Sequence, residues 1–126
     1  MSRTNVGAEL GGVLAPAVLV DDRVLYVSGH GPLRDGGYEP DTIEAETRLT
    51  LANLEATLTA AGSSLDQVVR VGVFLADLDH LGAMNAVYAE VFQPPRPART
   101  TVGVAALPGG IKVEIDCVAL VGGSPT

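Results

Sequence analysis

The sequence predicts an α+β fold in which one mixed β-sheet carries two helices on one face. Two segments have the spacing of apolar residues that is typical of amphipathic helices, and the segments around them are short and rich in β-branched residues. The predicted order of elements is therefore β-β-α-β-α-β-β. With 126 residues, the chain has the length of a single domain with one core.

The N-terminal part is predicted to contain two short strands within residues 18–28, VLVDDRVLYVS, around the turn residues Asp21 and Asp22. The loop that follows, SGHGPLRDGGYEPD, contains four glycines and two prolines. A loop of about a dozen residues in a small domain is often functional. Residues 1–15 and the small, polar tail 121–126 are expected to be loosely ordered.

The first helix is predicted over residues 41–62, with Asp41 as N-cap, Glu44 as its capping-box partner and Gly62 after the last turn. One mostly apolar face follows from a spacing of three or four residues, and it contains Ile43, Thr47, Leu51, Leu54, Leu58 and Ala61. The second helix is predicted over residues 79–92, capped by Asp79. Its inner face contains Leu81, Met84, Tyr88 and Val91.

Three further strands are predicted. Residues 68–78, VVRVGVFLADL, indicate a strand buried on both faces. Residues 99–107 and 111–120 are predicted to form a hairpin through a turn at residues 108–110, PGG. Alternation in the last strand places five side chains on one apolar face: Ile111, Val113, Ile115, Cys117 and Ala119.

This hairpin would pair Arg99 near Val118 and place Glu114 on the same side of the sheet, roughly 13 Å away along the strand. The face opposite the helices is then expected to carry Arg99, Glu114 and Asp116 next to apolar residues. A face that is half polar and half apolar is expected to be covered by self-association.

The net charge of −7 argues against nucleic acid, because binding to phosphates needs a basic surface. No apolar run approaches the roughly 18 residues of a membrane-spanning helix. The N-terminus has no long apolar region typical of a secretory signal, so we expect a cytoplasmic protein without membrane contact. A single cysteine, Cys117, excludes an intrachain disulfide, and with only two histidines no metal site is expected.

Four blocks of the sequence agree in order and spacing with one known family: VSGHGP at 27–32, AAGSSLDQVVRVGVFLADL at 60–78, MNAVYAEVF at 84–92, and PARTTVGVAALPGGIKVEIDCVAL at 97–120. Over residues 18–121 the chain resembles the Rid family of reactive-intermediate deaminases (YjgF/YER057c/UK114). The resemblance implies a chorismate-mutase-like fold of the bacillus type and a homotrimer with ligand clefts at the subunit interfaces. It also implies hydrolysis of 2-imino acids, such as 2-iminobutanoate and 2-iminopropanoate, to 2-keto acids and ammonia, without a metal or organic cofactor.

The same resemblance implies the site residues. Arg99 would bind the substrate carboxylate and Glu114 would position the water. The other expected substrate contacts are Ser28, Gly29, His30, Asn85 and Thr101. Two positions depart from the family pattern: Thr101 replaces a cysteine, and Ala15 replaces a tyrosine that many active members carry.

These residue types suit the chemistry. The planar fork of arginine matches a carboxylate, and a glutamate can orient a water molecule and accept its proton. Two other interpretations stay open. The chain could be a non-catalytic trimeric protein that binds small carboxylates, or a pathway-specific deaminase or hydrolase of a larger substrate for which Ala15 makes room. Arg99 could also form a surface salt bridge or be a structural interface residue, and Glu114 could pair with Lys112 or Arg99.

Overall fold

The computed structural model describes residues 1–10 and 12–122, so residues 123–126 of the tail expected to be loosely ordered lie outside the described residues, as does Gly11. The two long helices are α1 (Ile43–Ala60) and α2 (Leu81–Val91). Six strands form the main sheet: β1 (Arg3–Val6), β2 (Ala17–Val20), β3 (Val24–His30), β6 (Val68–Leu75), β7 (Ala98–Gly103) and β8 (Val113–Leu120). A separate small hairpin contains β4 (Leu33–Arg34) and β5 (Gly37–Tyr38).

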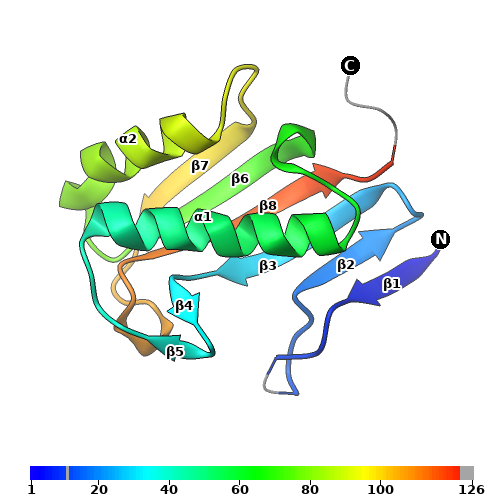
Figure 1. Cartoon of the computed structure of the whole chain (residues 1–126), viewed down its shortest axis with the longest axis horizontal. Helices are drawn as coiled ribbons and strands as arrows, with labels where there is room; N and C mark the ends of the chain where they lie inside the picture. The colour runs from blue at the N-terminus through cyan, green and yellow to red at the C-terminus, as the bar shows by residue number, and fades with distance from the viewer. Residues whose placement is uncertain (11, 123–126) are drawn as a thin grey trace.

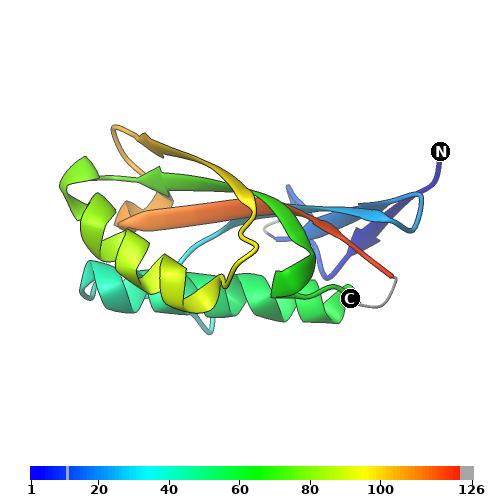
Figure 2. The same cartoon turned by 90° about the horizontal axis from the view of Figure 1, so that it is seen from above.

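The strand order in the main sheet is β1-β2-β3-β8-β6-β7 (Figure 1). β8 lies in the middle and runs antiparallel to both β3 and β6, whereas β7 lies at the edge and runs parallel to β6. Both helices cover the same face of the sheet (Figure 2). This arrangement confirms the predicted α+β architecture with two helices on one face.

The core lies between the helices and the covered face of the sheet. Leu51, Leu54 and Leu58 of α1 are fully or almost fully buried, as predicted from their spacing. They pack with Met84 and Val87 of α2 against alternate residues of the two central strands: Val71, Val73 and Leu75 of β6 and Val113, Ile115 and Cys117 of β8. Burial of one such large side chain stabilises the fold by about 1.5–3 kcal/mol.

The predicted helix C-terminus is confirmed, but both predicted N-caps are wrong. Gly62 follows α1 with a φ of +83°, and the N–H of Ser63 donates to the carbonyl of Leu58, as in a Schellman motif. The N-cap of α1 is Thr42, whose hydroxyl accepts the N–H of the third helical residue, and no capping box with Glu44 forms among the described residues. A short 3₁₀ turn over residues 78–80 precedes α2, so Asp79 lies in that turn.

The predicted hairpin of the last two strands is also wrong. β7 pairs with β6, placing Arg99 beside Val71, and residues 104–112 cross from the sheet edge to its centre. The physical reason is that β8 pairs with β3 on one side and with β6 on the other, which leaves no free edge of β8 for β7. The prediction that residues 68–78 form a strand buried on both faces fails at Val69 and Arg70, which are exposed, and at residues 76–78, which are exposed and follow the end of the strand at Leu75.

Three strands were not predicted. β1 pairs antiparallel with β2, although residues 1–15 carry little of the alternation that marks a strand. β4 and β5 form their two-residue pairing inside the glycine-rich loop, with Asp35 and Gly36 at positive φ in the turn. Such short edge pairings depend on tertiary context more than on local propensity.

Candidate functional site

Arg99 lies on the helix-covered face of the edge strand β7, in contrast to the prediction that it shares the open face with Glu114. Its neighbours across the sheet are Val71 and, one strand further, Cys117, which are both core residues. The guanidinium lies over the ring of Tyr88 in α2, 4.6 Å from the ring centroid. Tyr88 itself packs on Phe92 with a centroid separation of 4.7 Å. An aromatic face is a favourable surface for a guanidinium, because the ring quadrupole attracts the cation.

A shallow pocket of about 390 Å³ surrounds this pair, lined by Asn85, Tyr88, Ala89, Arg96, Pro97 and Arg99. We call it the arginine pocket. Spacing of three residues places Asn85 and Tyr88 on one side of α2. The Asn85 side-chain oxygen is buried and has no hydrogen-bond partner among the described residues. Arg99 makes no side-chain hydrogen bond within the same residues, so its N–H donors remain available to a ligand.

Glu114 points away from the helices, because it alternates with the buried Val113 and Ile115 of β8. It lies against Gly29 of β3, where an added Cβ would come within 2.8 Å of the Glu114 carboxyl carbon. Glycine at this position therefore permits the approach of the carboxylate. Burial raises the pKa of Glu114, the neighbouring Asp116 raises it further, and His30 partly offsets both.

Ser28 and His30, on the strand next to Glu114, make hydrogen bonds to other residues of the same chain. The Ser28 hydroxyl donates to the carbonyl of Ala15 at 2.7 Å. His30 lies 2.7 Å from the Ser28 carbonyl through Nδ1 and 2.7 Å from the Thr57 hydroxyl through Nε2. Since a carbonyl only accepts, Nδ1 carries a proton and donates it to the Ser28 carbonyl. Because Thr57 belongs to α1, the His30 ring faces the helix-covered side of the sheet, opposite to Glu114. We call Ser28, Gly29 and Glu114 the glutamate group.

The two groups are separated in one chain. Arg99 and Glu114 lie on opposite faces of the sheet, two strands and three residue levels apart, which gives about 14 Å between their Cα atoms. Thr101 shares the covered face with Arg99, because it is paired with Val73. Its hydroxyl is buried without a partner among the described residues. Within one chain, the arginine pocket and the glutamate group are therefore two separate places, which the proposal below treats as half-sites.

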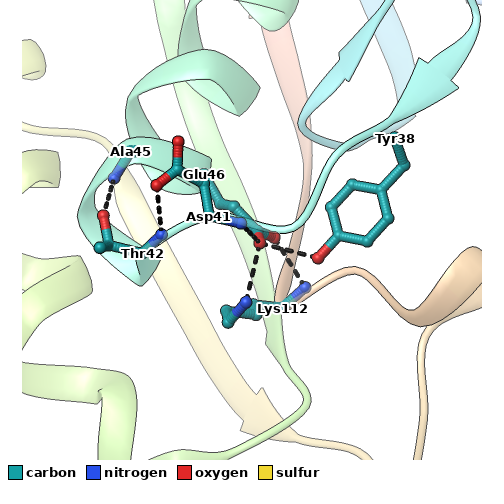
Figure 3. A network of polar contacts seen from close by, with 6 residues as sticks. All are labelled: Tyr38, Asp41, Thr42, Ala45, Glu46 and Lys112. Atoms are coloured by element: carbon teal, nitrogen blue, oxygen red, sulfur yellow. Dashed lines mark hydrogen bonds and ion pairs between the residues drawn. The ribbon is translucent and has the colours of Figure 1, made fainter.

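The buried carboxylate of Glu46 connects α1 with Lys112, the residue just before β8. Glu46 of α1 is 1% exposed and accepts hydrogen bonds from the Tyr38 hydroxyl, the Asp41 N–H and both nitrogens of Lys112 (Figure 3). Burial alone would raise the pKa of Glu46, but these hydrogen bonds outweigh it and lower the pKa. The network joins the start of α1, the small hairpin and the residue two positions before Glu114.

Sequence reasoning assigned Tyr88 only to the core and gave Arg96 no role. Tyr88 is indeed buried, but its ring also supports Arg99. The three-residue spacing of Asn85 and Tyr88 could have indicated that both lie on the same side of α2. The contact between the Tyr88 ring and Arg99 joins α2 with a later strand, and no local sequence pattern predicts it.

Within residues 1–10 and 12–122, no group of three His, Cys, Asp or Glu side chains is arranged to hold a metal ion. None of the helices in this part of the chain is long and apolar enough to cross a membrane.

Comparison with known proteins gives consistent results. The family model described as Endoribonuclease L-PSP matches residues 13–121. The mitochondrial protein mmf2 of Schizosaccharomyces pombe is 46% identical over 99 residues, which are 76% of this chain and 79% of that protein. The 2-iminobutanoate/2-iminopropanoate deaminase of Rattus norvegicus is 40% identical over 113 residues, 88% of this chain and 82% of the rat protein. The crystal structure of yeast Mmf1 has a TM-score of 0.91 and 31% identity, covering 96% of this chain and 100% of that one.

Proposed function

The chain belongs to the endoribonuclease L-PSP family, that of the Rid (YjgF/UK114) proteins, and we propose that it hydrolyses 2-imino acids to 2-keto acids and ammonia. The observation that carries this proposal is Arg99, whose guanidinium is supported by an aromatic ring while its donors remain uncommitted at a pocket. The rat relative named as a 2-iminobutanoate/2-iminopropanoate deaminase supports the choice of substrate.

In the proposed reaction, Arg99 binds the carboxylate next to the C=N bond through two parallel N–H donors. Glu114 orients a water molecule and accepts one of its protons as the water oxygen attacks the imine carbon. Glu114 passes this proton to the imine nitrogen, which gives the tetrahedral carbinolamine. The carbinolamine hydroxyl then gives its proton, through Glu114, to the amine as the C–N bond breaks, so that ammonia leaves and the 2-keto acid remains. The raised pKa of Glu114 suits it to this role, because a base is most effective when its pKa is close to the working pH.

The separation of the half-sites supports a cleft shared between copies of the chain. We infer that the arginine pocket of one copy faces the glutamate group of another in a homotrimer. The open face of the sheet offers a surface for this contact. It contains a hollow of about 380 Å³ and exposes Tyr26 (53%), Val102 (39%) and Leu120 (44%).

Imine trapping tests the activity. An amino-acid oxidase generates 2-iminobutyrate or 2-iminopropionate in place, and semicarbazide competes for the imine. We expect the wild type to suppress the trapped product, and Arg99→Ala and Glu114→Gln each to abolish the suppression. An equal yield of trapped product with and without the wild type would contradict deamination of these substrates.

A mixture of the two inactive variants tests the shared cleft. When Arg99→Ala and Glu114→Gln protomers are refolded together in equal amounts, about a quarter of the shared clefts contain both intact residues, so partial activity is expected. No activity would return if each site were built from one chain.

The alternative of a non-catalytic carboxylate-binding protein is kept because Ala15 contributes only its backbone carbonyl to Ser28. Binding of 2-ketobutyrate that depends on Arg99, without any loss of trapped imine, would select it. Cleavage of RNA is disfavoured by the net charge of −7. The cytoplasmic location stays a prediction, because the S. pombe relative is named as mitochondrial.

A further inference from the structure

The arginine pocket holds two cationic side chains, although the chain has only eight Lys and Arg residues and a net charge of −7. The ion pairs among the described residues are Arg48–Glu90 and Lys112–Glu46. Neither Arg96 nor Arg99 is therefore paired with a described carboxylate. Two neighbouring positive charges repel each other, and an anion between them would remove that cost.

Arg96 lies at the wall of this pocket, where two hydrogen bonds hold its exposed side chain. Its Nε donates to the Phe92 carbonyl at 2.7 Å and its Nη2 to the Ala89 carbonyl at 3.2 Å. These carbonyls belong to the C-terminal end of α2, which carries partial negative charge and fixes the guanidinium. The third nitrogen, Nη1, makes no hydrogen bond to the described residues. Arg96 thus keeps donors for a ligand while its position is already set, which reduces the entropy lost on binding.

The guanidinium groups of Arg96 and Arg99 both lie close enough to Tyr88 to affect its pKa. Burial raises the pKa of Tyr88, and the charges of Arg99 and Arg96 each oppose that rise. Arg96 precedes β7 and Arg99 lies within it, and both side chains line the same pocket, so they can contact one small ligand there. The pocket volume of about 390 Å³ is within the range of small-molecule sites.

We propose that Arg96 is a specificity-determining residue that selects 2-imino acids with a second carboxylate, so that the preferred substrate class is a short 2-imino dicarboxylate such as 2-iminosuccinate. Arg99 binds the carboxylate next to the imine, and Arg96 binds the carboxylate of the side chain. This inference rests on the proposed function and names its substrate class. An uncharged substrate side chain would leave the Arg96 charge unpaired once the cleft closes.

The experiment compares kcat/KM for 2-iminosuccinate, generated from aspartate, with that for 2-iminobutyrate, generated from 2-aminobutyrate, by imine trapping. The wild type is expected to prefer the dianion by about tenfold or more. Arg96→Met is expected to lower kcat/KM for 2-iminosuccinate by about 10- to 100-fold, as for loss of a hydrogen bond to a charged group. Its effect on 2-iminobutyrate is expected to stay within about threefold.

Gln93→Ala is the matched control. Gln93 also donates to a carbonyl at the end of α2, that of Glu90 at 2.9 Å, but it lies outside the arginine pocket. Its loss is expected to leave the ratio of the two kcat/KM values unchanged. Arg96→Lys keeps the charge and is expected to retain part of the preference. An equal fall for both substrates in Arg96→Met would show a purely structural role and overturn the proposal.

Binding of stable product analogues separates this inference from the proposed function. If neither imine is hydrolysed, the deaminase proposal fails, and calorimetry still compares oxaloacetate with 2-ketobutyrate. Tighter binding of oxaloacetate that is lost in Arg96→Met supports the second carboxylate site. Equal affinity of the wild type for the two acids overturns it.

Discussion

Replacement of Glu46 by alanine removes the acceptor of four hydrogen bonds from the protein interior. The Tyr38 hydroxyl donates at 2.7 Å, and the Asp41 N–H, the Lys112 N–H and the Lys112 ammonium each donate at 3.0 Å. The Glu46 side chain is 1% exposed, whereas that of Lys112 is 31% exposed. In the variant, two backbone N–H groups and a phenol lose their partner, and only the ammonium can turn readily to water.

The expected loss of unfolding free energy follows from these contacts. Breaking a buried ion pair by removing one partner costs about 3–5 kcal/mol. Because Lys112 is partly solvated, the lower end applies, about 3 kcal/mol. A domain of this size loses about 4 °C in Tm per kcal/mol, so Tm is expected to fall by about 12 °C. Glu55→Ala, on the exposed side of the same helix, is the control and is expected to change stability by less than about 0.5 kcal/mol.

The effect of Glu46 also depends on pH. Its pKa is lower in the folded protein than its usual value of 4.5, so folding favours the charged form. The stabilisation is fully present above the unfolded pKa and is lost as pH falls through the folded pKa. Urea denaturation of the wild type and Glu46→Ala from pH 7 to pH 3, at one protein concentration, is expected to show a shrinking difference. Equal stability at pH 7, or a difference that grows in acid, would refute this reasoning.

Three further predictions concern the site and the core. Gly29→Ala brings a Cβ within 2.8 Å of the Glu114 carboxyl carbon, so imine hydrolysis is expected to fall about tenfold or more with a small change in Tm; unchanged kcat would contradict the placement of Glu114. Tyr88→Phe is expected to keep activity, because the hydroxyl has no partner among the described residues. Tyr88→Leu is expected to raise KM roughly 2- to 30-fold as Arg99 loses its aromatic support, and the opposite ranking would assign the role to the hydroxyl. Burial raises the pKa of the Cys117 thiol to about 12, so a thiol reagent at pH 8 is expected to react only after unfolding, and rapid labelling of the native protein would show an exposed thiol.

Local patterns predicted the helices well and the strand pairing poorly. The buried face of α1 could be predicted because the spacing of its apolar residues is contained in the helix segment itself. The N-cap does not, because Asp41 and Thr42 are adjacent and both suit the position, and only the observed backbone assigns the cap to Thr42. The hairpin of β7 and β8 was wrongly predicted because two strands that follow one another in sequence are not necessarily neighbours in a sheet. β7 pairs with β6 instead.

The same limit applies to the site. The resemblance named Arg99 and Glu114, but their positions relative to one another depend on strand register. A shift of one residue moves a side chain to the other face of the sheet. The assumed hairpin placed both residues on the open face, whereas pairing with β6 places Arg99 beneath α2. No pattern within β7 alone distinguishes these arrangements.

The shared cleft that we propose follows from where the structure places Arg99 and Glu114. Arg99 is on an edge strand, so its pocket opens at the border of the sheet, whereas Glu114 is on the central strand and faces the uncovered side. In the proposed assembly, the edge of one sheet lies over the open face of another. Dissociation would then abolish hydrolysis while leaving the fold of each chain intact, because the core and the Glu46 network lie within one chain. Full activity in a folded, dissociated monomer would contradict the shared cleft and require Arg99 and Glu114 to act independently.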